Sequence, residues 1–573
     1  MIVRAELQGT IAMIAVEAGQ GVRAGQTLLY LEAMKMEHPV VAPAAGVVTS
    51  FSVTRGQTVM RDDELLVFRA GAAPEPAPAE TTGDEGRPDL DEVRARHALL
   101  ADEARPEAVG RRHEQGRRTA RENLAALVDE GTWVEYGGLA VAARRAVLSE
   151  EELRERTPAD GFIAGLGSVD GHRTAVASYD YLVLAGTQGY VGHRKKDRLF
   201  DVVARTGVPA VLFAEGGGGR PGDTDHPVVS GLDVMAFRLW AGLGVPRIGI
   251  ASGYCFAGNA GLFGCCDITI ATEGSSIGMG GPAMIEGAGL GRIAPGEVGP
   301  VEVHARSGVV DVVVPDDDAA VATARQALSY FRPGQSAWTA ADQASLRSAV
   351  PLDRKRAYDV RAVIETLADT GSVLELGERH APGLITALAR IEGTPVGLVV
   401  NNSAHLAGAV TGEGADKAAR FLGLCERFRL PVVSLIDTPG IMVGPEAEAT
   451  GLVRQAGGLF TAGARLTVPH VAVILRKAYG LGAQAMAGGT LLAPLLTVAW
   501  PTGELGAMGV EGAVNLALRK QLEAADDPRR MFDEAVSFIY ERGKALSAAA
   551  FFELDDVIDP AETRRVIAAF IGT

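Results

Sequence analysis

The sequence has few cysteines, no long apolar run and no long basic run, and each absence excludes a class of protein. Its four cysteines among 573 residues form no CxxC pair, so we expect neither a disulfide framework nor a metal site. No apolar stretch reaches the roughly 20 residues needed to cross a bilayer. The first residues, MIVRAELQG, do not resemble a secretion signal. These absences favour a reducing, cytoplasmic location.

The charge balance is acidic, with a formal net charge of −16. An acidic chain without a basic cluster is not expected to bind nucleic acid or an anionic membrane surface. The length and the 47% hydrophobic content support several domains with large buried cores.

The first 70 residues contain an internal repeat with an offset of 37 positions. Both units resemble short strands rich in Val, Ile and Leu, separated by turns that contain Gly. The repeat therefore predicts a flattened, all-β barrel. The matching positions are Gly9 with Gly46, Gly19 with Gly56, Gln20 with Gln57, Val22 with Val59, Leu28 with Leu65 and Leu29 with Leu66.

An EAMKM run at positions 32–36 lies between the two units. We expect the connection from Met34 to Ala45 to form a turn that presents the Lys35 amine to a modifying enzyme. In the alternative interpretation, Met34 and Met36 are core residues of a strand and Lys35 is an ordinary solvated lysine.

With this run, residues 1–70 resemble the biotinyl carrier domain of biotin-dependent carboxylases. The resemblance implies a barrel-sandwich fold, covalent biotin on Lys35 between Met34 and Met36, and a biotin protein ligase that attaches it. A lipoyl carrier has the same fold, but it usually carries an acidic residue at the position of Met34. Biotin is therefore favoured.

Residues 71–88 are rich in Pro, Ala and acidic residues, with almost no large apolar side chain. Such a composition predicts a flexible linker that spans roughly 25 Å as a coil. It would let a carrier domain swing, although a passive spacer has the same composition.

A second internal similarity predicts two homologous α/β domains, at residues 89–335 and 336–573. A helix followed by a buried strand occurs twice, with the strands VPAVLF at 208–213 and LPVVSL at 430–435. The next units, at 244–250 and 467–473, also correspond, and each leads into a Gly-rich turn and a helix of small residues.

The two Gly-rich turns, at 253–261 and 476–484, each follow a strand and open a helix. Small residues let backbone N–H groups approach a ligand, and the helix macrodipole favours negative charge there. Such a turn can form an oxyanion hole. The alternative is that the small residues only allow close packing.

Several motifs in residues 89–573 resemble the carboxyltransferase part of the acyl-CoA carboxylases. The resemblance implies two crotonase-like domains, an active site between two subunits, and a homo-oligomer with a hexameric core. Nothing in the sequence resembles an ATP-dependent biotin carboxylase, so we expect a separate subunit to load the biotin. The motifs are GRRTARENLAALVDEGTWVE, the helix around Gly192-His193, IDTPG, RKAYG, AWPTGELGAMG and VIDPAETR.

The resemblance also implies a reaction, in which a carboxyl group passes from carboxybiotin on Lys35 to the α-carbon of an acetyl-, propionyl- or longer acyl-CoA. The amides of Ala257 and Gly258 align with the hole for the thioester enolate. Those of Leu481 and Gly482 align with the hole for the biotin ureido oxygen. The family usually has two adjacent glycines in both holes.

Three further residues receive expectations from the same resemblance. Lys196 matches a family lysine and is expected to contact the CoA phosphates. Gln484 lies where the family varies with acyl-chain preference. His193 is not expected to act as a base, because the family is thought to pass the α-proton to biotin, and its basic stretch resembles a solvated helix face. The family loop SGGAR is replaced by EGGGGR at 215–220.

Two other functions stay open. A biotin-dependent decarboxylase or transcarboxylase would share these domains and run the chemistry toward carboxyl release. A non-catalytic biotin carrier scaffold is the alternative outside the enzymes, and only the altered holes favour it.

Overall fold

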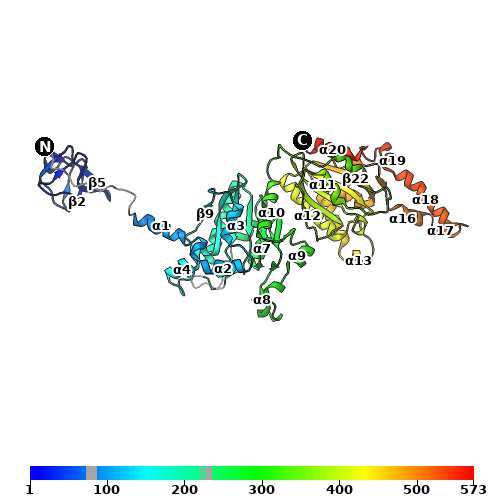
Figure 1. Ribbon diagram of the computed structural model, residues 1–573, viewed down its shortest axis with the longest axis horizontal. Coiled ribbons are helices and arrows are strands. Elements are labelled where there is room, and N and C mark those ends of the chain that lie inside the picture. The colour runs from blue at the N-terminus through cyan, green and yellow to red at the C-terminus, as the bar shows by residue number, and fades with distance from the viewer. Residues whose placement is uncertain (72–86, 221, 224, 226–234, 573) are drawn as a thin grey trace. The chain divides into compact units, whose positions relative to one another are not determined.

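The computed structural model describes residues 1–71, 87–220, 222–223, 225 and 235–572 (Figure 1). The chain divides into two compact units, Met1–Glu92 and Val93–Thr573. The predicted linker at 71–88 falls mainly on residues 72–86, which lie outside the described part.

The first unit consists of two four-stranded antiparallel sheets, with strand orders β1-β8-β6-β3 and β5-β4-β2-β7. The offset of 37 relates one sheet to the other, because it places β2 on β6, β3 on β7 and β4 on β8. The predicted repeat of two β-units is therefore confirmed. The strands are β1 (Ile2–Arg4), β2 (Gly9–Ile14), β3 (Gly21–Val22), β4 (Thr27–Ala33), β5 (Met36–Val41), β6 (Gly46–Phe51), β7 (Thr58–Val59) and β8 (Glu64–Ala70).

The second unit contains two large mixed sheets, and the first has the order β17-β15-β13-β12-β11-β10-β9. From β11 to β17 the neighbouring strands are parallel, and their near-continuous apolar sequences suit strands buried on both faces. The strands are β9 (Val134–Glu135), β10 (Phe162–Val169), β11 (His172–Tyr179), β12 (Ala210–Phe213), β13 (Arg247–Ala251), β15 (Ile268–Thr272) and β17 (Val312–Val314), with β14 (Tyr254–Phe256) paired to β16 (Ser276–Gly278).

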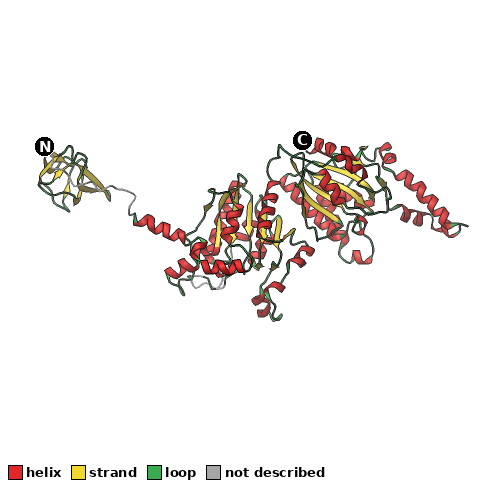
Figure 2. Ribbon diagram, in the orientation of Figure 1, coloured by secondary structure: helices red, strands yellow, loops and turns green. Residues whose placement is uncertain are grey.

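Several helices pack on these strands, whereas α1 and α8 have no buried residue and extend away from the sheet (Figure 2). Thr119 begins α3 with a capping box that it forms with Glu122, and Gly207 ends α5 in the left-handed conformation. The helices are α1 (Pro88–Ala98), α2 (Pro106–Glu114), α3 (Ala120–Leu127), α4 (Glu150–Arg156), α5 (Tyr190–Thr206), α6 (Ala236–Gly242), α7 (Gly258–Gly264), α8 (Pro282–Gly287), α9 (Val301–Ser307) and α10 (Asp317–Ser329).

The second large sheet has the order β18-β19-β20-β21-β22-β23-β25, with β24 paired to β22. Its strands are β18 (Leu374–Leu376), β19 (Leu384–Ile391), β20 (Thr394–Asn401), β21 (Val432–Thr438), β22 (His470–Tyr479), β23 (Leu496–Ala499), β24 (Glu504–Gly506) and β25 (Asp556–Val557). Its helices are α11 (Val360–Leu367), α12 (Gly412–Phe428), α13 (Pro445–Glu448), α14 (Leu452–Ala464), α15 (Gly480–Met486), α16 (Val510–Ala517), α17 (Arg519–Glu523), α18 (Pro528–Gly543), α19 (Ala545–Ala550) and α20 (Thr563–Ile571).

The two large sheets repeat one another at an offset of 222 positions. Strands β10 and β11 and helix α5 match β19, β20 and α12 end for end at this offset. From β13 onward the offset becomes 223, since β13 begins at Arg247 and β22 at His470. The structure thus contains the repeated helix and strand units, whereas the division into two homologous domains at 335/336 stays a prediction. A shared apolar cluster includes residues of both halves, such as Leu127 and Leu374.

Two buried lysines make the equivalence visible at the level of side chains. Lys195 on α5 donates to the backbone oxygens of Ala159 and Phe162, and Lys417 on α12 donates to those of Gly377, His380 and Leu384. Each lysine therefore ties its helix to the start of the same strand of its sheet. Within the described residues, we find no helix that has both the length and the apolar character of a membrane span.

Candidate functional site

Lys35 lies at the tip of a tight hairpin between β4 and β5. Ala33 pairs with Met36, so Met34 and Lys35 alone form the turn, with φ angles of 52° and 65°. Two consecutive positive φ angles are what a two-residue type I′ hairpin requires. The predicted exposure of Lys35 is confirmed, but the predicted turn from Met34 to Ala45 is wrong, because residues 36–41 form strand β5.

The flanking methionines point away from the core of the first unit. Met34 is 97% exposed and Met36 is 66% exposed, so neither is the core residue that the alternative interpretation required. Exposed methionines beside an exposed lysine give a modifying enzyme an apolar contact next to the reactive amine. Lys35 is also the only lysine in residues 1–71. The hairpin thus fits a group attached through a single lysine amide.

The first Gly-rich turn leads from β14 into α7. Ala257 precedes the helix with φ 51° and ψ −120°, and its N–H donates to the Gly278 oxygen at 2.8 Å. Gly258 is the first residue of α7, where a backbone N–H has no acceptor within the helix. Of the two predicted donors, Gly258 is therefore available, and the role predicted for the Ala257 amide is not supported because that N–H is already bonded.

A run of four glycines, Gly216–Gly219, lies beside this turn. A Cβ placed on Gly218 would lie 2.6 Å from the Ala257 Cβ and 3.5 Å from the Gly258 nitrogen. The loop and the start of α7 therefore approach each other closely, and only glycine permits this approach. Gly218 also has a positive φ of 86°, which favours glycine independently.

The second Gly-rich turn leads from β22 into α15 and repeats the construction of the first. Gly480 has φ 55°, as Ala257 has φ 51°, so Leu481 corresponds to Gly258. A Cβ placed on Gly482 would lie 2.5 Å from the carbonyl carbon of Gly440, which ends the IDTPG motif. Both predicted residues of this turn, Leu481 and Gly482, lie in the first turn of α15. We therefore align Leu481 and Gly482 with Gly258 and Asn259. The sequence instead pairs them with Ala257 and Gly258, one residue earlier.

The glycine loop of the first half is anchored at both ends by buried ion pairs. Before it, Glu215 accepts from Arg112 at 2.9 Å and from Arg117 at 3.3 Å. After it, Arg220 donates to Asp160 at 2.7 Å. Burial raises the pKa of Glu215 and that of Asp160, although the arginines oppose the shift. The anchors hold the loop against α7.

Lys196 is inside the domain and cannot contact a CoA phosphate at its surface. It is 1% exposed, and its ammonium group donates to Tyr179 Oη at 3.1 Å and to Gln188 Oε1 at 2.8 Å. His193 is also buried, with its Nδ1 unpaired among the described residues. The predictions of a phosphate contact and of a solvated basic helix face are both wrong, because one face of α5 packs against the sheet.

Gln484 lies on the same exposed face of α15 as Leu481, three residues later. Leu481 is 60% exposed and Gln484 is exposed as well. Residues three apart on a helix are neighbours on its surface. The exposed position of Gln484 beside Leu481 would allow a contact with a substrate. Its contribution to substrate choice stays a prediction.

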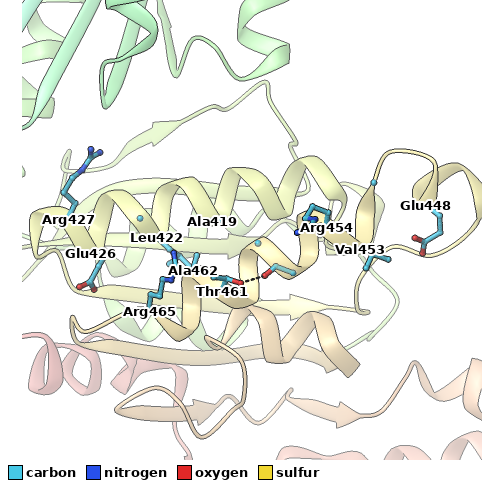
Figure 3. A pocket seen from close by; sticks show the side chains of 14 residues that line it. Ala419, Leu422, Glu426, Arg427, Glu448, Val453, Arg454, Thr461, Ala462 and Arg465 are labelled. Atoms are coloured by element: carbon cyan, nitrogen blue, oxygen red, sulfur yellow. Dashed lines mark hydrogen bonds between the residues drawn. The ribbon is translucent and has the colours of Figure 1, made fainter. Parts of the chain in front are cut away.

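A groove of about 980 Å³ lies between α12 and α14 (Figure 3). Small residues such as Gly457 and Gly458 form much of its wall. Glu426, Arg427 and Arg465 lie at one end, and Arg454 and Glu448 toward the other (Figure 3). Neither Leu481 nor Gly482 lines it, so the groove is separate from the Gly-rich turns.

An exposed lysine hairpin and two strand-to-helix turns with backbone amides available to bind an oxyanion are features of a carrier domain and of a transferase domain in one chain. Comparison with known families agrees: residues 1–68 match the biotin-requiring enzyme domain and residues 111–572 match the carboxyl transferase domain. The chain belongs to the biotin-dependent carboxyl transferase family. It is an enzyme of that family with two crotonase-like domains, and its cofactor is biotin.

Three similar proteins give the family context. A single-chain, multi-domain long-chain acyl-CoA carboxylase structure is 52% identical with a TM-score of 0.82, and the match covers 100% of this chain and 56% of that one. A transcarboxylase 12S structure, described as a hexamer assembly with methylmalonyl-CoA bound, is 31% identical over 85% of this chain and 95% of that one, with a TM-score of 0.75. Methylmalonyl-CoA decarboxylase subunit alpha of Propionigenium modestum is 30% identical over 81% of this chain and 91% of its own length.

This chain thus spans 56% of the length of the single-chain carboxylase.

Proposed function

We propose that this protein transfers a carboxyl group from biotin attached to Lys35 to the α-carbon of an acyl-CoA, with a product of the malonyl-CoA type. The observation that carries the proposal is the duplicated turn, in which Gly258 packs beside Gly218 and Gly482 packs beside Gly440. A reaction that develops negative charge on two different oxygens needs two such sites.

The backbone amides supply the chemistry of the protein itself. The Gly258 N–H has no hydrogen-bond acceptor within α7. We assign it to the thioester oxygen, which becomes negatively charged as the α-carbon loses its proton. The amides of Leu481 and Gly482 are assigned to the ureido oxygen of the cofactor. Removing one donor of this kind typically raises the barrier by about 3 kcal/mol. Biotin, when bound, supplies the carboxyl carrier.

No side-chain base is assigned. Burial and the nearby cations Lys196 and Arg220 lower the pKa of His193 to about 3, so its imidazole is neutral at neutral pH. A neutral, buried imidazole that is remote from solvent is a poor receiver of a proton that must later leave the site. His193 is therefore assigned no proton transfer, and the family resemblance implies that biotin, when bound, would receive the α-proton.

The substrate and the partners are part of the proposal. Acyl-CoAs of propionyl length and longer are the first candidates, since long-chain acyl-CoA and methylmalonyl-CoA appear in the names of the similar proteins. Acetyl-CoA stays a prediction from the sequence. A separate biotin carboxylase, a biotin protein ligase, a homohexameric core and a cytoplasmic location also stay predictions.

A second candidate is carboxyl release from a malonyl-CoA-type substrate, and the decarboxylase relative favours it. The same amides would stabilise the enolate in that direction. The two directions of reaction differ in the partner they need. Carboxyl release needs a partner that consumes the carboxyl group, whereas carboxylation needs an ATP-dependent subunit that loads the biotin. The family consists of enzymes, which argues against the scaffold alternative.

The test is fixation of labelled bicarbonate by the biotinylated full-length chain with a biotin carboxylase and ATP. Acetyl-, propionyl-, butyryl- and longer acyl-CoAs form the substrate panel, and Lys35→Ala is the control. Labelled product that disappears in the control would establish the carboxylase and rank its substrates. Carboxylated protein that labels no acyl-CoA in the panel would reject the carboxylase direction.

A further inference from the structure

A chain of buried polar side chains connects Lys196 to the amide assigned to the thioester oxygen. The Lys196 ammonium donates to Gln188 Oε1 at 2.8 Å, and Gln188 Nε2 donates to Asn259 Oδ1 at 3.0 Å. Asn259 Nδ2 then donates to the Gly186 oxygen at 3.3 Å. Lys196, Gln188 and Asn259 are all at most 5% exposed, so water does not compete for these bonds.

The lysine at one end and the acceptor-only Gly186 carbonyl at the other fix the direction of every hydrogen bond in this chain. An ammonium group can only donate, so the oxygen of Gln188 must face Lys196 and its amide nitrogen must face Asn259. The same reasoning then orients the Asn259 side chain toward Gly186. Without the cation, the Gln188 amide could turn over and leave buried groups unpaired.

Gln188 contacts both parts of the assigned oxyanion site. Its side chain lies against Gly258, because a Cβ on that glycine would be 2.9 Å from Gln188 Nε2. Its backbone N–H donates to the Gly218 oxygen at 2.7 Å, and its backbone oxygen accepts from Arg220 at 3.0 Å. A single residue therefore sets the spacing between the glycine loop and the start of α7.

The second half of the chain lacks this arrangement. Val410 takes the place of Gln188, Ala418 that of Lys196 and Gly482 that of Asn259, at the offsets of 222 and 223 positions defined above. The shared lysine of both helices is Lys195 with Lys417, which holds the fold. A buried lysine present in one half alone, and joined to the site of that half, points to the chemistry of that site.

We propose that Lys196, acting through Gln188 and Asn259, is a positioning residue that holds the Gly258 amide and the Gly216–Gly219 loop in the geometry for a thioester oxyanion. The inference rests on the proposed function, because it assigns a support to the site named there.

The surroundings of Lys196 make its charge sensitive to pH. Burial lowers the pKa of Lys196 to about 7, opposed by Asp197 and Asp160. Tyr179, which accepts a hydrogen bond from Lys196, has a pKa that burial raises, and the pKa of the nearby His193 is lowered to about 3. Cys255, whose pKa burial also raises, interacts with Tyr179. Lys195, whose pKa burial lowers to about 8, is next to Lys196 in sequence but bonds to other partners. The support should weaken as pH rises through the pKa of Lys196.

The experiment measures kcat and KM for an accepted acyl-CoA at pH 6.5 and pH 9, with excess biotin carboxylase and the biotinylated full-length chain. The variants are Lys196→Met, Gln188→Leu and the double variant, each compared with wild type at the same pH. We expect Lys196→Met to lower kcat about 10- to 100-fold at pH 6.5 and less than threefold at pH 9, with KM within about threefold. The double variant should be no slower than the slower single variant.

A kcat of Lys196→Met within twofold of wild type at pH 6.5 would overturn the inference. So would an equal loss at both pH values, or single effects that multiply in the double variant. If Lys196→Met does not fold, Gln188→Leu decides alone, and an unchanged kcat overturns the inference. An inactive wild type would overturn the proposed function together with it, whereas an active wild type with unaffected variants overturns the inference only.

Discussion

Glu215 and Asp437 occupy equivalent positions, 222 residues apart, and each is a buried carboxylate that an arginine holds at the start of a glycine-containing loop. Glu215 accepts from Arg112 at 2.9 Å, and Asp437 accepts from Arg476 at 3.0 Å. The arginines come from different elements, a helix before the first sheet and a strand of the second sheet. The loop position is thus preserved although its anchor is built differently.

Removing the carboxylate charge at Glu215 should destabilise the carboxyltransferase region. Glu215→Gln leaves the buried Arg112 and the partly buried Arg117 without a charge partner, and breaking a buried pair in this way costs about 3 kcal/mol. Urea unfolding measures the loss. The matched control is Glu534→Gln, whose partner Arg530 is 76% exposed, and it should change the free energy of unfolding by less than about 0.5 kcal/mol. Equal effects would show that the Glu215 cluster is not a structural anchor.

Biotin attachment should depend on Lys35 alone. Lys35→Arg keeps the charge and the hairpin but cannot form the amide, so intact-mass measurement should show no incorporated biotin after co-expression with a biotin protein ligase. The control is Lys355→Arg, since that lysine side chain is 72% exposed yet lies outside the first unit. Biotin retained in Lys35→Arg would place the attachment elsewhere in the chain.

The strained conformation of Ala257 predicts a stabilising substitution. A positive φ with ψ near −120° is unfavourable for a residue with a Cβ, by about 1–3 kcal/mol. Ala257→Gly removes this strain but adds chain entropy to the unfolded state, so we expect a net gain of up to about 1 kcal/mol. Ala260→Gly, within α7, should instead lose about 1 kcal/mol. Thermal unfolding of both variants tests the sign, and a loss in both would contradict the strained geometry.

The sequence predicted the two repeats and the division into β and α/β parts because apolar periodicity and Gly positions record them directly. It could not show that Lys196 is buried, since a basic run on a helix has the same sequence pattern whether it faces solvent or a sheet. It also could not distinguish a free amide from a bonded one. The Ala257 N–H is lost as a donor only because β16 brings the Gly278 oxygen to it, a contact between segments that the motif does not contain.

One signal for Lys196 was nevertheless present in the sequence. Lys195 has a counterpart in Lys417 at the offset of 222, whereas Lys196 falls on Ala418. Comparison of the two halves position by position would have separated the lysine that serves the fold from the one that is particular to the first half. The offset of 222 is established only by the structure, in which the bounds of β10, β11 and α5 match those of β19, β20 and α12.

Close packing at the second turn predicts loss of activity from one added methyl group. In Gly482→Ala the new Cβ would lie 2.5–2.9 Å from backbone atoms of Gly440, so the turn or the loop must shift. A displaced amide should lower kcat about 100-fold with a smaller effect on KM for acyl-CoA. Gly264→Ala is the control, because nothing lies within 4 Å of its Cβ position, and its kcat should match wild type. A Gly482→Ala variant with normal kcat would argue against a catalytic role for this turn.

The buried lysines predict that the free energy of unfolding rises with pH above neutrality. Burial lowers the pKa of Lys196 to about 7 and those of Lys195 and Lys417 to about 8, against 10.5 in an unfolded chain. Between these values the unfolded state binds more protons than the folded state, and stability therefore increases with pH. The gain from one such lysine is at most about 1.4 kcal/mol per pH unit.

Lys196→Met isolates the contribution of one lysine to this pH dependence. Methionine fills a similar volume without a charge, so the variant should gain less stability than wild type between pH 7 and pH 9, by about 2 kcal/mol. Below pH 7 the folded wild type must carry the buried charge. In that range the free energy of unfolding of the variant should come closest to that of wild type or exceed it. Urea unfolding at pH 6, 7, 8 and 9 gives both slopes. Lys355→Met, at an exposed position, should keep the wild-type slope, and equal slopes in Lys196→Met and wild type would mean that Lys196 keeps an ordinary pKa.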